Sequence, residues 1–125
     1  MEPLAWDEVR SLARQGVGFG AHTKSHPILA RISDAAGQRL EIEHSKRRPE
    51  EELGAAAAHF CYPNGAPGDF DQTSLDCVAD AGFRTAVTTS PGLNRAGAEP
   101  FLLRRFGMEP GSPLAYALER RRLHD

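Results

Sequence analysis

The fold is decided by the stretch VGFGAHTKSHP, residues 17–27. Its first five residues are apolar or glycine, which predicts a short buried strand over residues 17–21. Because glycine weakens a strand, Gly18 and Gly20 indicate close packing, or a backbone that must approach another group. The remaining residues, 22–27, predict a loop at the carboxyl end of that strand.

Helices and strands alternate on both sides of this stretch. Helical periodicity and capping residues predict helices over residues 6–15, 34–53, 71–81 and 112–122. Apolar and β-branched runs predict further strands over residues 56–62, 83–89 and 101–108. Such alternation is typical of βα units, in which helices cover the faces of a parallel sheet and the connections are right-handed. The sequence therefore predicts an α/β fold with parallel strands.

The second predicted helix is polar and strongly charged. Ser33 or Asp34 is its N-cap, and Gly54 marks its end. Basic residues precede Pro49 and acidic residues follow it, and opposite charges three or four positions apart support each other on a solvated helix face. We prefer this explanation to an interaction patch. Pro49 is expected to kink or interrupt the helix.

Composition limits the class of protein. The chain has 125 residues, the size of one domain, and its 40% hydrophobic content is enough for one core. A formal net charge of −2 gives no basic field for nucleic acid. No stretch has the roughly eighteen apolar residues that a membrane span needs. Cys61 and Cys77 are too few for a disulfide framework.

Two histidines lie four positions apart in the loop that follows the first predicted strand. In parallel βα folds the chemistry is located in loops after strand carboxyl ends, here residues 22–27, 63–70 and 90–100. The imidazoles of His22 and His26 are good ligands for zinc, cobalt, nickel or iron. By spacing alone, two unrelated surface or core histidines would be the more common explanation.

The residues around the two histidines indicate an ordered loop. Pro27 disfavours the right-handed helical region for His26, which indicates a tight loop that leads into a short helix. The hydroxyl of Thr23 is expected to bond to the backbone or to the second imidazole, which would lock the loop.

Residues 22–27 resemble the H-[ST]-x-x-H-P motif of polysaccharide deacetylases of the NodB homology family, also called carbohydrate esterase family 4. The similarity spans roughly residues 4–106 in order. It continues through four further segments, residues 6–8, 16–17, 60–65 and 81–89. In this context metal binding becomes the preferred explanation for His22 and His26.

The resemblance implies a distorted (β/α) barrel and a hydrolase of carbon–nitrogen bonds other than peptide bonds. Its substrates would be N-acetylated polysaccharides or oligosaccharides, from which it removes acetyl groups in carbohydrate metabolism. In this family one aspartate and two histidines hold a divalent metal, and His22 and His26 match the two histidines. Zinc is the expected ion, with cobalt or nickel as alternatives. The resemblance also gives Asn64 a catalytic role, in which its backbone N–H helps to hold the tetrahedral oxyanion.

The chain departs from the family pattern in three places. The Thr-Phe-Asp-Asp-Gly motif, which supplies the third metal ligand and the general base, has no match. We therefore expect residues 1–125 to form a single incomplete domain that lacks its amino-terminal aspartate motif. Asp69 and Asp71 are interpreted as a loop residue and a helix N-cap. Cys61 replaces the arginine that orients the base, and Asn64 replaces a tyrosine. The histidine that protonates the leaving amine has no convincing match.

The sequence is compatible with three functions. The preferred one is a metal-dependent N-deacetylase that is inactive as this isolated fragment. The alternative is a non-catalytic carbohydrate-binding or assembly domain that retains the barrel fragment. The missing carboxylates and the missing leaving-group histidine favour this alternative. A third is another metal hydrolase on a βα barrel that shares the histidine spacing by chance. An incomplete barrel would leave a sheet edge unpaired, so we also expect self-association.

Overall fold

The computed structural model describes residues 3–107. The predicted helix over residues 112–122 lies outside the described residues. Within them the structure begins with three helical elements, α1 (Trp6–Arg14), the short 3₁₀ helix η1 (Leu29–Arg31) and α2 (Ala35–Leu53). The remaining elements are β1 (His59–Cys61), α3 (Gln72–Asp80) and β2 (Thr85–Val87). None of the helices in this part of the chain is long and apolar enough to cross a membrane.

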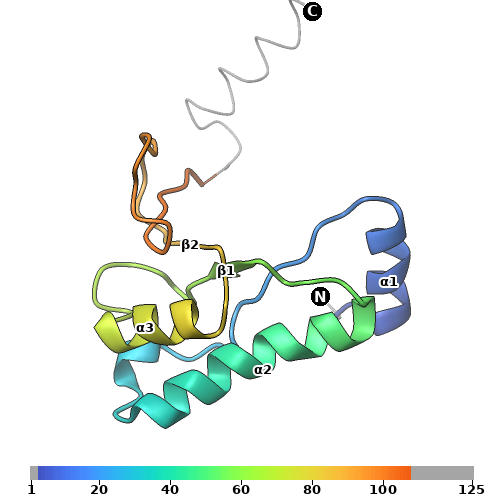
Figure 1. Cartoon of the computed structure of the whole chain (residues 1–125), viewed down its shortest axis with the longest axis horizontal. Coiled ribbons are helices and arrows are strands. Elements are labelled where there is room, and N and C mark those ends of the chain that lie inside the picture. The colour runs from blue at the N-terminus through green and yellow to red at the C-terminus, as the bar shows by residue number, and fades with distance from the viewer. Residues whose placement is uncertain (1–2, 108–125) are drawn as a thin grey trace, which may run out of the picture.

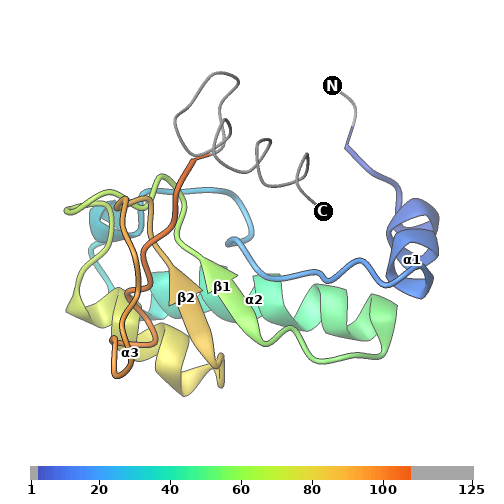
Figure 2. The same ribbon diagram turned by 90° about the horizontal axis from the view of Figure 1, so that it is seen from above.

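The strands form a parallel sheet, as the alternation of helices and strands predicts. β1 and β2 pair in parallel with Phe60 opposite Ala86, and Figure 2 shows the two strands side by side, pointing the same way. Single parallel bridges extend this order on both sides, from Ala21 to Phe60 and from Leu103 to Val87. α2 and α3 lie on one side of the sheet (Figure 1).

Two predicted strands are reduced to these single bridges. The prediction of a buried strand over residues 17–21 is wrong except at Ala21, because Val17 is 46% exposed and its N–H bonds to Leu12 at the end of α1. The prediction over residues 101–108 is wrong except at Leu103, as far as the structure describes it. There the N–H of Arg104 bonds to the side chain of Asn94 instead of to a strand.

Gly20 sits where two backbones meet. A Cβ atom at this position would lie 2.8 Å from the carbonyl oxygen of His59. The same carbonyl accepts a 2.9 Å hydrogen bond from the N–H of Ala21. The close backbone approach that the sequence predicts is therefore confirmed at Gly20.

Helix α2 runs without interruption through Pro49, so of the predicted kink or interruption the interruption is wrong. Asp34 caps it by accepting a hydrogen bond from the N–H of Gly37, and Gly54 ends it in the left-handed conformation at φ 63°. Three i,i+4 ion pairs bridge the turn around the proline and support it there. They are Lys46–Glu50, Arg47–Glu51 and Arg48–Glu52.

The hydrophobic core lies between the sheet and the helices α2 and α3. Its buried members from the strands are Phe60 and Ala86, which lie opposite one another in the ladder. α2 contributes Ile42, and α3 contributes Cys77 and Val78. This packing fixes α2 beneath the strand ends that carry the predicted site.

Helix α3 begins at the residue that the sequence predicts. The side chain of Asp71 accepts a hydrogen bond from the N–H of Ser74, and the hydroxyl of Ser74 accepts one from the N–H of Asp71. Buried Ser74 also donates to the side chain of Gln38 on α2 at 2.6 Å. The cap therefore ties α3 to α2 as well as starting the helix.

Candidate functional site

The two histidines lie at the carboxyl end of the parallel sheet. His22 directly follows Ala21, which pairs in parallel with Phe60 of β1. His26 is four residues further along the same loop, and both imidazoles are exposed. This is the end of the strands at which parallel βα folds place their chemistry.

The structure brings the two imidazoles together. Their ring centroids are 4.8 Å apart with an interplanar angle of 74°, an edge-to-face arrangement. Nδ1 of His22 lies 2.7 Å from the carbonyl oxygen of Cys61. Because a carbonyl oxygen only accepts, Nδ1 carries the proton and the lone pair of Nε2 is left for a ligand. A backbone carbonyl on the second ring nitrogen is the usual support for a metal-binding histidine.

The loop is held in an uncommon backbone conformation. Thr23 and His26 both adopt left-handed φ angles, 65° and 59°. The hydroxyl of Thr23 donates to the carbonyl of His22 at 2.6 Å and accepts from the N–H of His26 at 3.1 Å. The predicted locking role of Thr23 is confirmed, and it acts through the backbone. Such angles persist in non-glycine residues only where the surroundings enforce them.

Glu41 of α2 is the residue that sequence reasoning missed. Its Oε2 accepts hydrogen bonds from the N–H groups of Lys24 and Ser25, each at 2.9 Å. Its Oε1 accepts from the hydroxyl of Ser25 at 2.7 Å. Burial opposes its charge, but the hydrogen bonds from Ser25 and Lys24 prevail and hold the pKa of Glu41 below its usual range. No local sequence signal distinguishes Glu41 from the other acidic residues of this helix.

Asn64 lies at the same end of the sheet, on the loop that follows β1. It is exposed, with a left-handed φ of 59°, in a turn closed by a 2.7 Å hydrogen bond from the N–H of Gly65 to Pro63. Within residues 3–107 the N–H of Asn64 donates no hydrogen bond. The adjacent strands bring the Asn64 and His22 loops to one edge, and the catalytic role of Asn64 stays a prediction.

Four other residues near this end of the sheet, Cys61, Tyr62, Asp69 and Asp71, have structural roles. Cys61 is partly buried on β1, and it serves the site through its carbonyl group. Tyr62 is fully buried and stacks on Phe70 with ring centroids 4.2 Å apart, and burial raises the pKa of its hydroxyl. Asp69 accepts a hydrogen bond from the N–H of Ala66, and Asp71 caps α3. The interpretation of both aspartates as structural residues is confirmed.

The residues present fit part of a metal site. Two imidazoles are suitable ligands for zinc and similar divalent ions, and the tautomer of His22 leaves Nε2 available. However, residues 3–107 contain no group of three or more histidine, cysteine, aspartate or glutamate residues that could hold an ion. A protein zinc site normally has at least three such ligands. The described residues therefore bring together two candidate ligands, His22 and His26, which is fewer than such a site needs.

A hollow of about 490 Å³ adjoins His22 on the face of the sheet opposite the core. Side chains alternate along a strand, so Phe60 and Ala86 enter the core and their neighbours face this hollow. On this face, Nδ1 of His59 lies 2.8 Å from the hydroxyl of Thr85, the residue opposite it in the ladder. The side chains on this face come from β1, β2 and the segment that pairs with β1 through Ala21. They belong to His22, His59, Cys61, Thr85 and Val87.

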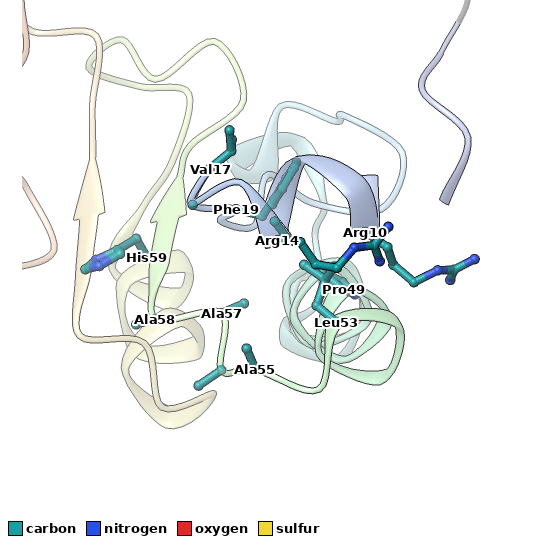
Figure 3. A pocket seen from close by; sticks show the side chains of 13 residues that line it. Arg10, Arg14, Val17, Phe19, Pro49, Leu53, Ala55, Ala57, Ala58 and His59 are labelled. Atoms are coloured by element: carbon teal, nitrogen blue, oxygen red, sulfur yellow. The ribbon is translucent and has the colours of Figure 1, made fainter. Parts of the chain in front are cut away.

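A second hollow, of about 520 Å³, is lined by neither His22 nor His26. Figure 3 shows it between Arg10 and Arg14 of α1 and Pro49 and Leu53 near the end of α2. Its floor includes residues 55–58, which lead into β1. It therefore lies at the amino end of β1, opposite the end that carries His22.

Comparisons with known proteins support the fold. A family model described as polysaccharide deacetylase matches residues 3–86. The Streptococcus pyogenes deacetylase PplD, solved in complex with acetate, is 24% identical with a TM-score of 0.83, covering 93% of this chain and 50% of that chain. A de-N-acetylase from Aggregatibacter actinomycetemcomitans is 13% identical with a TM-score of 0.74, covering 93% and 52%. IcaB from Ammonifex degensii is 19% identical, also with a TM-score of 0.74, covering 94% and 52%.

No curated protein matches the chain. At such low identities the solved structures establish the fold alone, and they confirm the α/β fold, a partial (β/α) barrel with parallel strands. The chain spans about half the length of these solved structures.

Proposed function

The chain belongs to the polysaccharide deacetylase family, and from this premise we propose that it is part of a metal-dependent N-deacetylase. The reaction is the hydrolysis of an acetamido group on an N-acetylated polysaccharide or oligosaccharide. A water oxygen bonds to the carbonyl carbon, the carbon–nitrogen bond breaks, acetate leaves, and the sugar nitrogen gains a proton. The solved neighbours include a deacetylase in complex with acetate and a de-N-acetylase, which agrees with this reaction class.

The paired imidazoles of His22 and His26 carry this proposal. The carbonyl of Cys61 orients His22, and the left-handed turn at His26 brings its ring within 4.8 Å of the first. These two side chains would hold a divalent ion, zinc in the first place and cobalt or nickel as alternatives. When bound, such an ion polarises the acetamide carbonyl and lowers the pKa of a water.

The N–H of Asn64 is proposed to stabilise the oxyanion that forms at the acetamide carbonyl. Its left-handed conformation at the carboxyl end of β1 leaves the N–H without a partner in the described part of the chain. A backbone donor needs no particular side chain, so the replacement of the family tyrosine by Asn64 is compatible with this role.

The third ligand and the general base are proposed to come from outside residues 3–107. Two observations support this view. The described residues include no cluster of three ligand-type side chains, and the chain spans about half the length of its solved neighbours. We accordingly propose that residues 1–125 form one incomplete deacetylase domain that is inactive alone.

Titration of the 125-residue chain with zinc tests the imidazole pair. Calorimetry should give weak binding, with a dissociation constant above the micromolar range, because two neutral ligands leave the ion one protein ligand short. His22→Ala and His26→Ala should each abolish the binding. His44→Ala, on the partly exposed side of α2, is the matched control and should leave it unchanged. A submicromolar affinity that His22→Ala removes would contradict the incomplete site.

An activity assay tests the reaction. An N-acetylated oligosaccharide is incubated with the chain alone and with a longer version that adds an upstream Asp-Asp motif, each with and without a chelator. We expect acetate release only from the longer version, and only without chelator. Binding of the oligosaccharide without acetate release in either version would instead favour a carbohydrate-binding domain.

A further inference from the structure

We propose that Glu41 is a positioning residue for the imidazole pair, holding the intervening loop in the conformation that presents both rings before an ion binds. The inference rests on the proposed metal-binding role of His22 and His26. Glu41 is placed on α2, so it lies outside the loop that it organises.

The first argument is the completeness of the contacts. The two residues between Thr23 and His26 are Lys24 and Ser25, and Glu41 accepts hydrogen bonds from both of their N–H groups at 2.9 Å. The next N–H, that of His26, bonds to Thr23. Three successive backbone donors are thus directed at side chains, which fixes the path of the loop.

The second argument is the cost of the loop conformation. Thr23 and His26 bracket the Glu41 contacts, and both have left-handed φ angles. β-Branched residues such as threonine avoid this region, and they stay in it only where several contacts enforce it. Hydrogen bonds to an ionised carboxylate are stronger than neutral ones, so Glu41 supplies the strongest restraints on the loop.

The third argument is the rigidity of the platform. Ile42, the next residue on α2, is fully buried in the core. The carboxylate is therefore presented from a packed helix, whereas the loop itself is exposed. Glu41 belongs to no cluster of three ligand-type residues in the described part of the chain, so its role toward an ion is indirect.

The test compares Glu41→Ala and Glu41→Gln with Glu43→Ala in the full 125-residue chain without metal. Glu43 is the matched control, because it lies on the same helix and pairs with Arg39 instead of the loop. Glu41→Ala should speed amide hydrogen exchange at Lys24 and Ser25 at least about tenfold, since charged hydrogen bonds are lost. Glu41→Gln, which keeps one acceptor oxygen, should give a smaller effect, and Glu43→Ala none.

The NMR signals of the imidazoles supply a readout that a purely structural role would not move. Glu41→Ala should shift the ring resonances of His22 and His26 and leave those of His44 unchanged. Unchanged ring resonances and unchanged exchange at Lys24 and Ser25 would overturn the proposal. If Glu41→Ala does not fold, Ser25→Ala removes one contact without altering α2 and should shift the same signals to a smaller extent.

Zinc titration separates this proposal from the proposed function. Loss of a support behind a metal ligand costs about 10- to 100-fold in affinity, so Glu41→Ala should bind zinc at least about tenfold more weakly. Wild-type affinity in Glu41→Ala, together with loss of binding in His22→Ala, would overturn the positioning role alone. If the wild-type chain binds no zinc, the metal function fails, and the ring resonances still decide whether Glu41 positions the pair.

Discussion

At the scale of single residues, the site depends on a few close backbone contacts. The carbonyls of His59 and Cys61 take part in the contact between β1 and the segment that ends in His22. Gly20 permits that contact, because a side chain there would collide with the backbone of β1. One glycine therefore connects the strand pairing to the orientation of the first imidazole.

Replacement of Gly20 by alanine tests this connection. The new Cβ would meet the carbonyl oxygen of His59 at 2.8 Å, so the two backbones must separate. We expect the free energy of unfolding, measured by urea denaturation, to fall by about 1–3 kcal/mol. Gly18→Ala is the control, because a Cβ at Gly18 meets nothing within 4 Å. Equal stability of Gly20→Ala and Gly18→Ala would contradict the close approach.

At the scale of elements, the helices were predictable and the strand lengths were not. A helix start is a local matter, so Asp71 could be identified as a cap from its neighbours alone. A strand exists only through its partner, and residues 17–21 carry no local sign that Ala21 alone would pair.

In the candidate site, too, the sequence predicts what depends on neighbouring residues and misses what depends on distant ones. His22 and His26 lie four apart in one recognisable motif, so sequence could find both. The role of Glu41 depends on how α2 packs under a loop 16 residues away in sequence, which no local pattern reveals.

The cap of α3 gives a pH-dependent prediction at this scale. Hydrogen bonding, chiefly from the N–H of Ser74, holds the pKa of Asp71 below its usual value. A lowered folded-state pKa means that the contribution is complete above the unfolded value of about 3.9 and is lost as pH falls through the lower folded value. Asp71→Ala should lower the free energy of unfolding at pH 7 by about 1 kcal/mol.

Urea denaturation at several pH values measures this effect. The difference between wild type and Asp71→Ala should shrink below pH 4, since the protonated carboxyl no longer accepts as strongly. Asp76→Asn, an exposed change on the same helix, is the control and should give a small, uniform effect. A difference that stays constant down to pH 2 would contradict the assigned cause.

At the scale of the whole molecule, the sheet has helices on one side and a hollow on the other. α2 and α3 cover the core side (Figure 1), and the residues that line the hollow of about 490 Å³ lie on the opposite face. Closed barrels bury such a face in their interior. In the part of the chain that the structure describes, the outer backbone groups of β1 bond to Ala21 and those of β2 to Pro100 and Leu103, and no further strand pairs beyond these segments.

This open sheet leads to the prediction that the 125-residue chain self-associates. The outer segments around Ala21 and Leu103 have no further strand partner among the described residues, which favours contact with a second copy, so light scattering should give a mass that rises with concentration. Val87→Lys places a charge on the uncovered face and should shift the equilibrium toward the monomer. Leu93→Lys is the control, because Leu93 is 83% exposed and lies outside the strands. A wild-type chain that stays monomeric at high concentration and melts cooperatively would show that the sheet is stable without a cover. In that case the face of the sheet around His22 would be stable in contact with solvent, and the prediction of self-association would be wrong.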